Sequence, residues 1–481
     1  MDRLILYGSG KRCKVLCKIL QWGEVEILAI LDSNPVRWGK KVGGNWVESP
    51  KKIEDYHDAA ICITVSDISA VKEIRKNLHQ MYGYDLKKEI GYYKIILEIY
   101  KKRYKITQKM QPHIHNFNKQ DTIIFDCYNG LGLGGVETWT INLCEALLRK
   151  GDRAAYIISD NGVYHVPDAI KKNIINVDID HYNQFSLNTI DKLVEVIIKK
   201  LPCKVITCTT NEVMLAACLV KRYCPDMIQI ISVIHNSNEK VYKDYMDLRE
   251  CSDIYIGVSQ DIKNDMIYRG VEPEKIYSMT CPFFCERNLE RVYTENYSMP
   301  IRIGYAGRMD GMLHSQKRMD LFLKTIEVLV EKNVCFDLEF AGDGPARHRM
   351  EETISANRWD DRVHFLGTLE RSKMPNFWKE KDICLNLADY EGRSISIIEA
   401  MGSGAVPIVT STSGVREDIK DNVNGYIIPL GDYNAAATKI QYLEANRWRL
   451  RDLGKEAHDV VYPKSLMEPH IAFWEKILWK K

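Results

Sequence analysis

A short apolar segment, a glycine-containing turn and an amphipathic segment follow one another repeatedly along this chain, and this order limits its fold more than any other feature. The pattern starts three times, near residues 4, 121 and 301. Parallel strands that are buried on both faces need helical crossovers, so the alternation predicts α/β units with parallel sheets covered by helices. A length of 481 residues suits about three such units.

The apolar segments and the breaks between them predict five parts. We expect an α/β accessory domain at residues 1–105, a basic linker at 106–120, α/β domains at 121–295 and 296–465, and a final helix at 466–481. The linker contains Pro112, His113 and His115 and has no strand-forming run, so the boundary falls there. The expected strands include residues 4–7, 26–32, 59–65, 121–126, 253–259, 301–308, 336–342, 363–367, 383–388 and 406–410, and the expected helices include 11–22, 69–81, 137–150 and 260–268.

The composition favours a globular protein without a nucleic-acid partner. Hydrophobic residues make up 45% of the chain and charged residues 27%, and a net charge of +2 gives no long-range attraction to polyanions. We find no secretory signal and no run of about 18 apolar residues, and we therefore expect a cytoplasmic location. The 14 cysteines show no paired framework and no zinc-site spacing, so we expect reduced thiols and no metal site.

Two carboxylates eight residues apart, Glu391 and Glu399, form the most informative constellation. They flank a predicted strand-to-helix junction, with Glu391 on the loop and Glu399 on the helix that starts near Ser394. The first backbone N–H groups of a helix have no intrahelical partner, and together with the helix dipole they favour a phosphate. An anion-binding helix N-terminus between two hydroxyl-accepting carboxylates suits a nucleoside diphosphate sugar.

Two cations strengthen this hypothesis. Arg308 ends the first predicted strand of the third unit, and Lys317 follows nine residues later on a loop or at a helix start. Both residues are expected at the carboxyl ends of the strands, where ligands of open α/β sheets bind. There they can neutralise a diphosphate without a metal ion and stabilise the charge that develops as the sugar leaves.

Residues 121–481 resemble the GT-B glycosyltransferases of family 4, which are retaining and use nucleotide sugars. The segment 305–320 resembles the arginine–lysine clamp on the diphosphate, 340–345 resembles the glycine turn, and 363–369 resembles the segment that faces the base. Residues 391–401 resemble the family's motif of two glutamates separated by seven residues, and 134–139 resemble the first loop of its N-terminal domain. Residues 413–418 and 424–432 resemble the usual close of its C-terminal domain.

The resemblance implies a GT-B fold, two Rossmann-like domains facing across a cleft, with an extra Rossmann-like domain at residues 1–105 and a final helix that returns to the N-terminal GT-B domain. It implies that Arg308 and Lys317 bind the diphosphate, that Glu391 contacts sugar hydroxyls and that His235, at a predicted strand end, shapes the sugar pocket. These four are the expected catalytic residues. The expected donor-binding residues are Gly134, Gly135, Leu369, Gly392, Arg393, Ser394, Ile395, Ser396 and Glu399, with the ribose on Glu399.

The expected function is therefore transfer of a sugar, with retention, from a nucleoside diphosphate sugar to a glycan or lipid-linked acceptor in cell-surface polysaccharide synthesis. A UDP-sugar is favoured, and neither a metal nor another cofactor is required. The alternative is a catalytically silent sugar-nucleotide-binding subunit of a glycosyltransferase complex. A bifunctional enzyme with NAD-linked chemistry in the first unit is weakened because Cys13 replaces the third glycine of the dinucleotide-binding turn.

Arg393 and Ser394 depart from the family's usual residues at these positions. Arg393 could bind a phosphate or a charged sugar, or it could point to solvent. Two further features stay open. The expected accessory domain at residues 1–105, with Asp32 at the end of its second strand, either binds a nucleotide or serves only in assembly. The basic run 101–109, which includes Tyr104 and Ile106, is either a solvated connector or a peripheral contact with the inner face of an anionic membrane.

Overall fold

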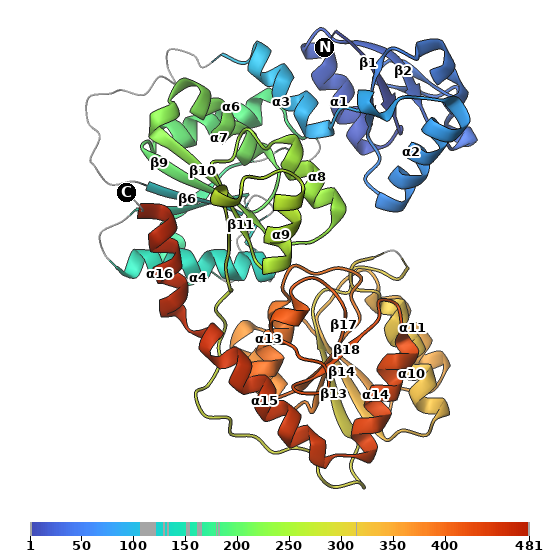
Figure 1. Ribbon diagram of the computed structural model, residues 1–481, viewed down its shortest axis with the longest axis vertical. Helices are drawn as coiled ribbons and strands as arrows, with labels where there is room; N and C mark the ends of the chain where they lie inside the picture. Colours follow the sequence, from blue (N-terminus) through green and yellow to red (C-terminus); the bar gives the residue numbers. More distant parts are fainter. Residues whose placement is uncertain are drawn as a thin grey trace. The chain divides into compact units, whose positions relative to one another are not determined.

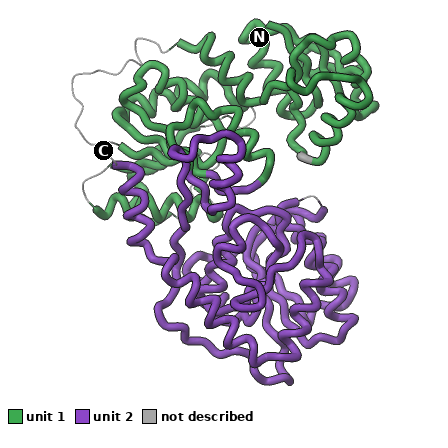
Figure 2. Tube along the Cα trace, in the orientation of Figure 1, with its two compact units in different colours: residues 1–233, 238–255 green, residues 234–237, 256–481 purple. Residues whose placement is uncertain are grey.

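The computed structural model describes residues 2–105, 122–127, 130–131, 134–150, 154–160, 166–178, 180, 183–313 and 315–479. The predicted linker at 106–120, with His113 and His115, lies outside the described residues. The chain forms two compact units, shown in green and purple in Figure 2. The first comprises residues 1–233 and 238–255, and the second comprises 234–237 and 256–481. His235 thus belongs to the second unit, although the strand that precedes it, at Ile228–Ile234, begins in the first.

A five-stranded sheet with the order β3-β4-β2-β1-β5 forms the beginning of the first unit. Strand β1 pairs in parallel with β2 and β5, whereas β3 and β4 are antiparallel. Its core contains Ile5, Leu31 and Ile61, which alternate with the opposite face as strand geometry requires. The elements are β1 (Arg3–Tyr7), α1 (Lys11–Trp22), β2 (Glu26–Leu31), β3 (Lys41–Val42), β4 (Asn45–Glu48), β5 (Ala60–Ile63), α2 (Ile68–Tyr82) and α3 (Tyr92–Arg103).

The turn after β1 is held by Asp32. Its carboxylate accepts hydrogen bonds from the backbone N–H of Ser9 at 2.9 Å and from the Ser9 hydroxyl at 2.5 Å, and its other oxygen accepts from the N–H of Asn34 at 2.9 Å. Gly8 has a φ of +102°, and a Cβ there would lie 2.6 Å from the Val65 side chain. Asp32 therefore fastens this turn to the end of β2.

A seven-stranded sheet follows, with the order β12-β11-β10-β9-β6-β7-β8. Strand β6 pairs in parallel with β7 and β9, and β9 pairs in parallel with β10. The elements are β6 (Thr122–Cys127), α4 (Gly135–Arg149), β7 (Ala155–Ser159), α5 (Asp168–Lys171), β8 (Ile174–Asn176), α6 (Leu187–Ile198), β9 (Cys203–Thr207), α7 (Glu212–Tyr223), β10 (Ile228–Ile234), α8 (Glu239–Asp247), β11 (Ile254–Gly257), α9 (Gln260–Tyr268) and β12 (Ile276–Ser278).

The third sheet lies in the second unit and has the order β15-β14-β13-β16-β17-β18, with parallel pairs throughout. Helices α10 and α14 lie on one side of it, and α13 and α15 lie on the other (Figure 1). The elements are β13 (Ile301–Ala306), α10 (Met319–Glu331), β14 (Phe336–Ala341), α11 (Arg347–Ala356), β15 (Val363–Gly367), α12 (Met374–Lys379), β16 (Ile383–Asn386), α13 (Ile395–Gly402), β17 (Val406–Thr410), β18 (Tyr426–Ile428), α14 (Tyr433–Ala445), α15 (Trp448–Ser465) and α16 (Met467–Trp479).

The predicted α/β class is confirmed by these three sheets. Helices α1 and α9 and strands β15 and β17 have the predicted bounds, and most other predicted elements shift by one or two residues at an end. The antiparallel hairpin of β3 and β4 was not among the predicted elements. Within the described residues, no helix is both long and apolar enough to span a membrane.

Candidate functional site

The candidate site lies where the order of the third sheet reverses. Strands β14 and β15 extend from one side of β13, and β16, β17 and β18 extend from the other. Ligands of open α/β sheets bind beyond the carboxyl ends of the strands at such a reversal. The loop after β13 carries Arg308 and Lys317, and the loop after β16 carries Glu391. The topology therefore brings together the two predicted motifs.

Lys317 and Glu391 form an ion pair between the Nζ and Oε1 atoms. Both side chains are largely buried, with 11% and 9% of their surfaces exposed. The amide of Gln316 donates to the second oxygen of Glu391 at 3.3 Å and to the carbonyl of Tyr390 at 3.1 Å. An ionised carboxylate has about four lone-pair sites, so Glu391 can still accept hydroxyl groups of a ligand while it holds Lys317.

Arg318, the next residue, fixes the position of Lys317. Its backbone is left-handed, with φ of 46° and ψ of 57°, which is costly for a residue that has a Cβ. Its guanidinium group binds both oxygens of Asp389 at 2.9 and 3.0 Å and both oxygens of Asp320 at 2.9 Å. These ion pairs connect the loop after β13 to the loop after β16, and they offset the backbone strain.

Arg308 lies at the edge of this arrangement. Its side chain is 67% exposed and forms an ion pair with Asp310 at 3.1 Å. A second guanidinium nitrogen lies 3.4 Å from the side-chain oxygen of Gln316, the residue before Lys317. The guanidinium is thus close to the Lys317 loop and is accessible to a diphosphate.

Helix α13 begins immediately after the Glu391 loop. Ser394 is its N-cap residue but makes no side-chain capping bond to the backbone; its hydroxyl lies 3.1 Å from the hydroxyl of Ser396. The first N–H groups, those of Ile395 and Ser396 among them, have no partner within the helix. Glu399 lies in the second turn and is half-buried. Burial raises its pKa to about 7, and Arg371 opposes this shift.

His235 lies beside the Glu391 loop. A Cβ at Gly392 would lie 2.1 Å from the His235 carbonyl oxygen, so only glycine allows this approach. The hydroxyl of Ser237 also donates to the Glu391 carbonyl at 2.6 Å. Burial lowers the pKa of His235 to about 4, so the imidazole is neutral near pH 7. It can exchange hydrogen bonds with a sugar, but it supplies no positive charge.

We expect Gly392→Ala to lower kcat for the expected sugar transfer by about 100-fold, because a displacement of about 1 Å near reacting groups can have this effect. The added Cβ overlaps a backbone carbonyl, which cannot rotate away as a side chain can. Gly10→Ala is the control, since a Cβ there meets no atom within 4 Å. A Gly392→Ala protein with unchanged kcat would show that this close approach is irrelevant to the chemistry.

Arg393 is buried rather than exposed to solvent. It forms two buried hydrogen bonds to Asp418, at 2.8 and 2.7 Å, and Lys464 also binds Asp418 at 2.8 Å. The alternative that Arg393 points to solvent is therefore wrong. The residue anchors the loop between Glu391 and α13 from within the protein.

The remaining predicted donor-binding residues are Leu369, Gly134 and Gly135. Leu369 is half-buried against the apolar cluster that contains Ala341 and Phe377. Gly134 and Gly135 belong to the first unit, where Gly134 is the N-cap residue and Gly135 the first residue of α4. No group of three metal-ligating side chains is found within the described parts of the chain.

The sequence reasoning missed Gln316, Arg318, Asp389 and Ser237. The first three lie within two residues of Lys317 or Glu391 in the sequence, and this proximity could have marked them as residues that orient the ion pair. Ser237 carried no such signal, since its contact with Glu391 joins residues 154 positions apart.

Two family descriptions match the chain. Residues 291–460 match the family described as glycosyl transferases group 1, and residues 1–90 match a family described as C2185-like, N-terminal. The first match includes Arg308, Lys317, Glu391 and Glu399.

The similar proteins include two bacterial enzymes whose names refer to sugars or glycosyl transfer. The N-acetyl-alpha-D-glucosaminyl L-malate synthase of Bacillus anthracis is 24% identical over 280 residues, which cover 55% of this chain and 71% of that protein. The amylovoran biosynthesis glycosyltransferase AmsK of Erwinia amylovora is 27% identical over 207 residues, which cover 41% of this chain and 49% of that protein. The matched segments thus span 71% of the length of the first relative and about half of the second.

A solved structure shows the fold. Anabaena Alr3699/HepE, determined in complex with UDP-glucose, superposes with a TM-score of 0.59 at 14% identity over 74% of this chain and 99% of that chain. The shared architecture is GT-B, so the predicted fold is confirmed.

Proposed function

We propose that this protein, a glycosyltransferase whose residues 291–460 match the group 1 family, moves a sugar from a nucleoside diphosphate sugar to a glycan or lipid-linked acceptor of cell-surface polysaccharide synthesis. The observation that carries the proposal is the buried Lys317–Glu391 pair beside the N-terminus of α13. It combines a cation, a hydroxyl acceptor and unpaired N–H groups, which are the groups that a sugar diphosphate requires.

The proposed donor is a UDP-sugar, and the structure of HepE in complex with UDP-glucose supports this choice. The name of AmsK, which assigns it to amylovoran biosynthesis, supports a role in polysaccharide synthesis. In the proposed mode the diphosphate lies between Lys317, Arg308 and the first turn of α13. Glu391 accepts hydroxyls of the sugar, and Glu399 accepts hydroxyls of the ribose. These groups provide the charge balance, so no metal ion is required in this proposal.

The proposed reaction retains the anomeric configuration. As the bond between the anomeric carbon and the phosphate oxygen breaks, negative charge accumulates on the diphosphate, where Lys317 and Arg308 stabilise it. The leaving phosphate oxygen takes the proton of the acceptor hydroxyl, and the acceptor oxygen bonds to the anomeric carbon on the same face. Neutral His235 orients the sugar by hydrogen bonding. The products are the glycosylated acceptor and a nucleoside diphosphate.

Thermal unfolding with a panel of UDP-, GDP- and ADP-sugars tests the donor proposal. We expect a UDP-sugar to raise the unfolding temperature of the protein, with the shift persisting in EDTA and disappearing in Glu399→Ala. A shift that EDTA abolishes would contradict metal-free binding. A shift without any sugar release or transfer would favour a catalytically silent subunit.

The affinity for UDP-glucose is expected to rise several-fold between about pH 6 and pH 8. Burial raises the pKa of Glu399 to about 7, so the unliganded protein holds this carboxyl partly protonated. Ribose hydroxyls stabilise the carboxylate, so binding releases a proton and strengthens as pH rises toward the raised pKa. Calorimetric titration measures this dependence, which Glu399→Gln should abolish. UDP-glucose is the better titrant for this experiment than UDP, because its diphosphate does not ionise near pH 6 and so adds no pH dependence of its own.

The same shift affects stability. Because the folded-state pKa of Glu399 is raised, its contribution to stability is full below about pH 4 and declines as pH rises through about 7.

We also propose that the protein works at the cytoplasmic face of a membrane, in peripheral contact with it. The exposed Lys102 and Lys105 of the basic run support this location. Lys101 and Arg103 form ion pairs, and Tyr104 is buried, so these three residues do not contribute to it.

A further inference from the structure

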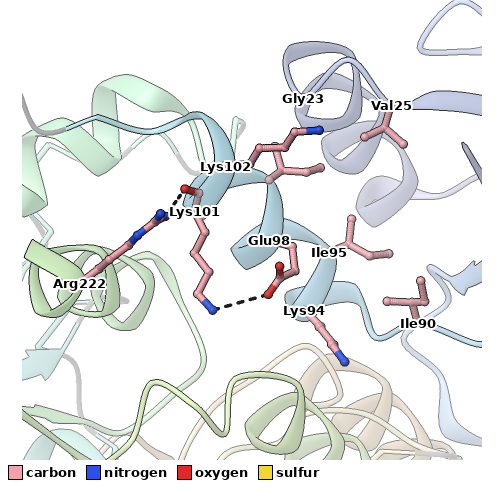
Figure 3. A pocket seen from close by; sticks show the side chains of 10 residues that line it. Gly23, Val25, Ile90, Lys94, Ile95, Glu98, Lys101, Lys102 and Arg222 are labelled. Carbon is pink, nitrogen blue, oxygen red and sulfur yellow. Dashed lines mark hydrogen bonds and ion pairs between the residues drawn. The ribbon is translucent and has the colours of Figure 1, made fainter. Parts of the chain in front are cut away.

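A pocket of about 810 Å³ opens in the first unit beside α3 (Figure 3). Its walls come from three parts of the unit: the turn between α1 and β2, helix α3 together with Ile90 just before it, and the end of α7. Gly23 allows the turn to approach α3, because a Cβ there would lie 2.8 Å from the Ile99 side chain. The volume is within the range of pockets that hold small ligands.

The apolar wall of the pocket is aliphatic. It consists of Val25, Ile90, Ile95 and Ile99, and no aromatic side chain is among the lining residues. Ile95 and Ile99 are buried, whereas Val25 and Ile90 remain half-buried at the opening. A nucleotide base would need an aromatic face for stacking, and the one guanidinium that lines the pocket, that of Arg222, instead donates to the Lys101 carbonyl. Sugar hydroxyls would need several acceptors. This wall instead suits a hydrocarbon chain.

The rim of the pocket is cationic. Four lining residues are basic, Lys94, Lys101, Lys102 and Arg222, and one, Glu98, is acidic. Lys101 forms ion pairs with Glu98 and Glu250, and Arg222 donates to the Lys101 carbonyl, as the dashed lines in Figure 3 show in part. Lys94 and Lys102 are exposed and make no ion pair with another described residue. Their charges therefore remain available to an anion.

We infer that this pocket binds an acidic phospholipid of a membrane, with the phosphate on Lys102 and part of an acyl chain against the aliphatic wall, while Lys94 faces the surrounding anionic headgroups. An aliphatic cavity edged by exposed lysines is complementary to such an anionic amphiphile. The inference rests on the proposed function only in naming the site of its membrane contact. It assigns lipid binding to the junction between the first sheet and the rest of the first unit, outside the sugar-transfer site.

Sedimentation with vesicles of equal parts phosphatidylglycerol and phosphatidylcholine tests the inference on the full chain. We expect binding that is absent with phosphatidylcholine alone and that weakens by roughly tenfold or more in Lys94→Ser/Lys102→Ser, since each lysine near a charged surface contributes severalfold. The control Lys72→Ser/Lys76→Ser removes the same charge from exposed positions on α2. Equal losses in the two double variants would overturn the inference.

A second pair of variants separates chain binding from phosphate binding. Val25→Asp and Val36→Asp each add one negative charge to the first unit, but Val36 is 72% exposed and lies outside the pocket. We expect only Val25→Asp to reduce vesicle binding several-fold, and glycerol 3-phosphate to compete weakly. Equal effects of the two substitutions, or full displacement by glycerol 3-phosphate at the lipid concentration, would reduce the pocket to a phosphate site. Sugar transfer to a soluble acceptor should persist in every pocket variant, so failure of the lipid site leaves the proposed reaction testable.

Discussion

Lys317→Ala should lower kcat for sugar transfer by about 100- to 1,000-fold, the range expected when one group that stabilises transition-state charge is removed. The Nζ atom of Lys317 forms a largely buried ion pair with Glu391. In the proposed donor complex it is also next to the diphosphate. Its charge matters most as the sugar leaves, so the loss should appear in kcat more than in KM. Initial rates of nucleoside diphosphate release measure it.

Removing Lys317 also leaves a buried carboxylate without its cation, so loss of folding must be separated from loss of catalysis. Adding Glu391→Gln to Lys317→Ala removes the isolated charge, and this double variant should recover thermal stability without recovering kcat. Lys332→Ala, at an exposed position after α10, is the matched control. A Lys317→Ala protein that is folded and retains more than about a tenth of kcat would refute the assigned role.

Asp418→Ala should destabilise the second unit by about 3–5 kcal/mol, the usual effect of removing one member of a buried ion pair. Only 7% of Arg393 and 5% of Asp418 is exposed, and Lys464 shares the same carboxylate. The substitution leaves a buried guanidinium uncompensated directly after Gly392. Denaturant unfolding followed by tryptophan fluorescence gives the change in the free energy of unfolding, and kcat should fall as the Glu391 loop loses its anchor.

Asp452→Ala provides the control, because Asp452 is exposed on α15 and should change stability little. Combining Asp418→Ala with Arg393→Met removes the uncompensated guanidinium, so part of the lost stability should return. If Asp418→Ala is no more destabilising than Asp452→Ala, the pair does not anchor the loop. If Arg393→Met alone abolishes donor binding in a stable protein, Arg393 contacts the donor after all.

The parts of the fold that sequence predicted are those fixed by local patterns. Helix α9 (Gln260–Tyr268) starts after Ser259, whose hydroxyl accepts a hydrogen bond from the Ile262 N–H. The apolar residues of this helix recur at helical spacing. Strands β15 and β17 are short apolar runs bounded by turns. Such signals lie within about ten residues of chain and need no knowledge of the partner elements.

The parts of the site that sequence missed depend on long-range packing. Arg318 in a left-handed conformation is unexpected for a residue with a long side chain, and the carboxylate of Asp389 that helps to hold it is 71 residues away. The burial of Arg393 depends on Asp418, 25 residues further along. Asp32 shows the same limit: its oxygens accept hydrogen bonds from Ser9 and Asn34, contacts that its position at a predicted strand end did not indicate.

The most direct test of the proposed reaction is nucleoside diphosphate release from a panel of UDP-, GDP- and ADP-sugars, with acceptor and with EDTA. We predict release from a UDP-sugar, a product of unchanged anomeric configuration by proton NMR, and loss of release in Lys317→Ala but not in Lys332→Ala. Absence of release from every donor by a folded protein that still binds the nucleotide sugar would contradict it, as would a product with inverted configuration.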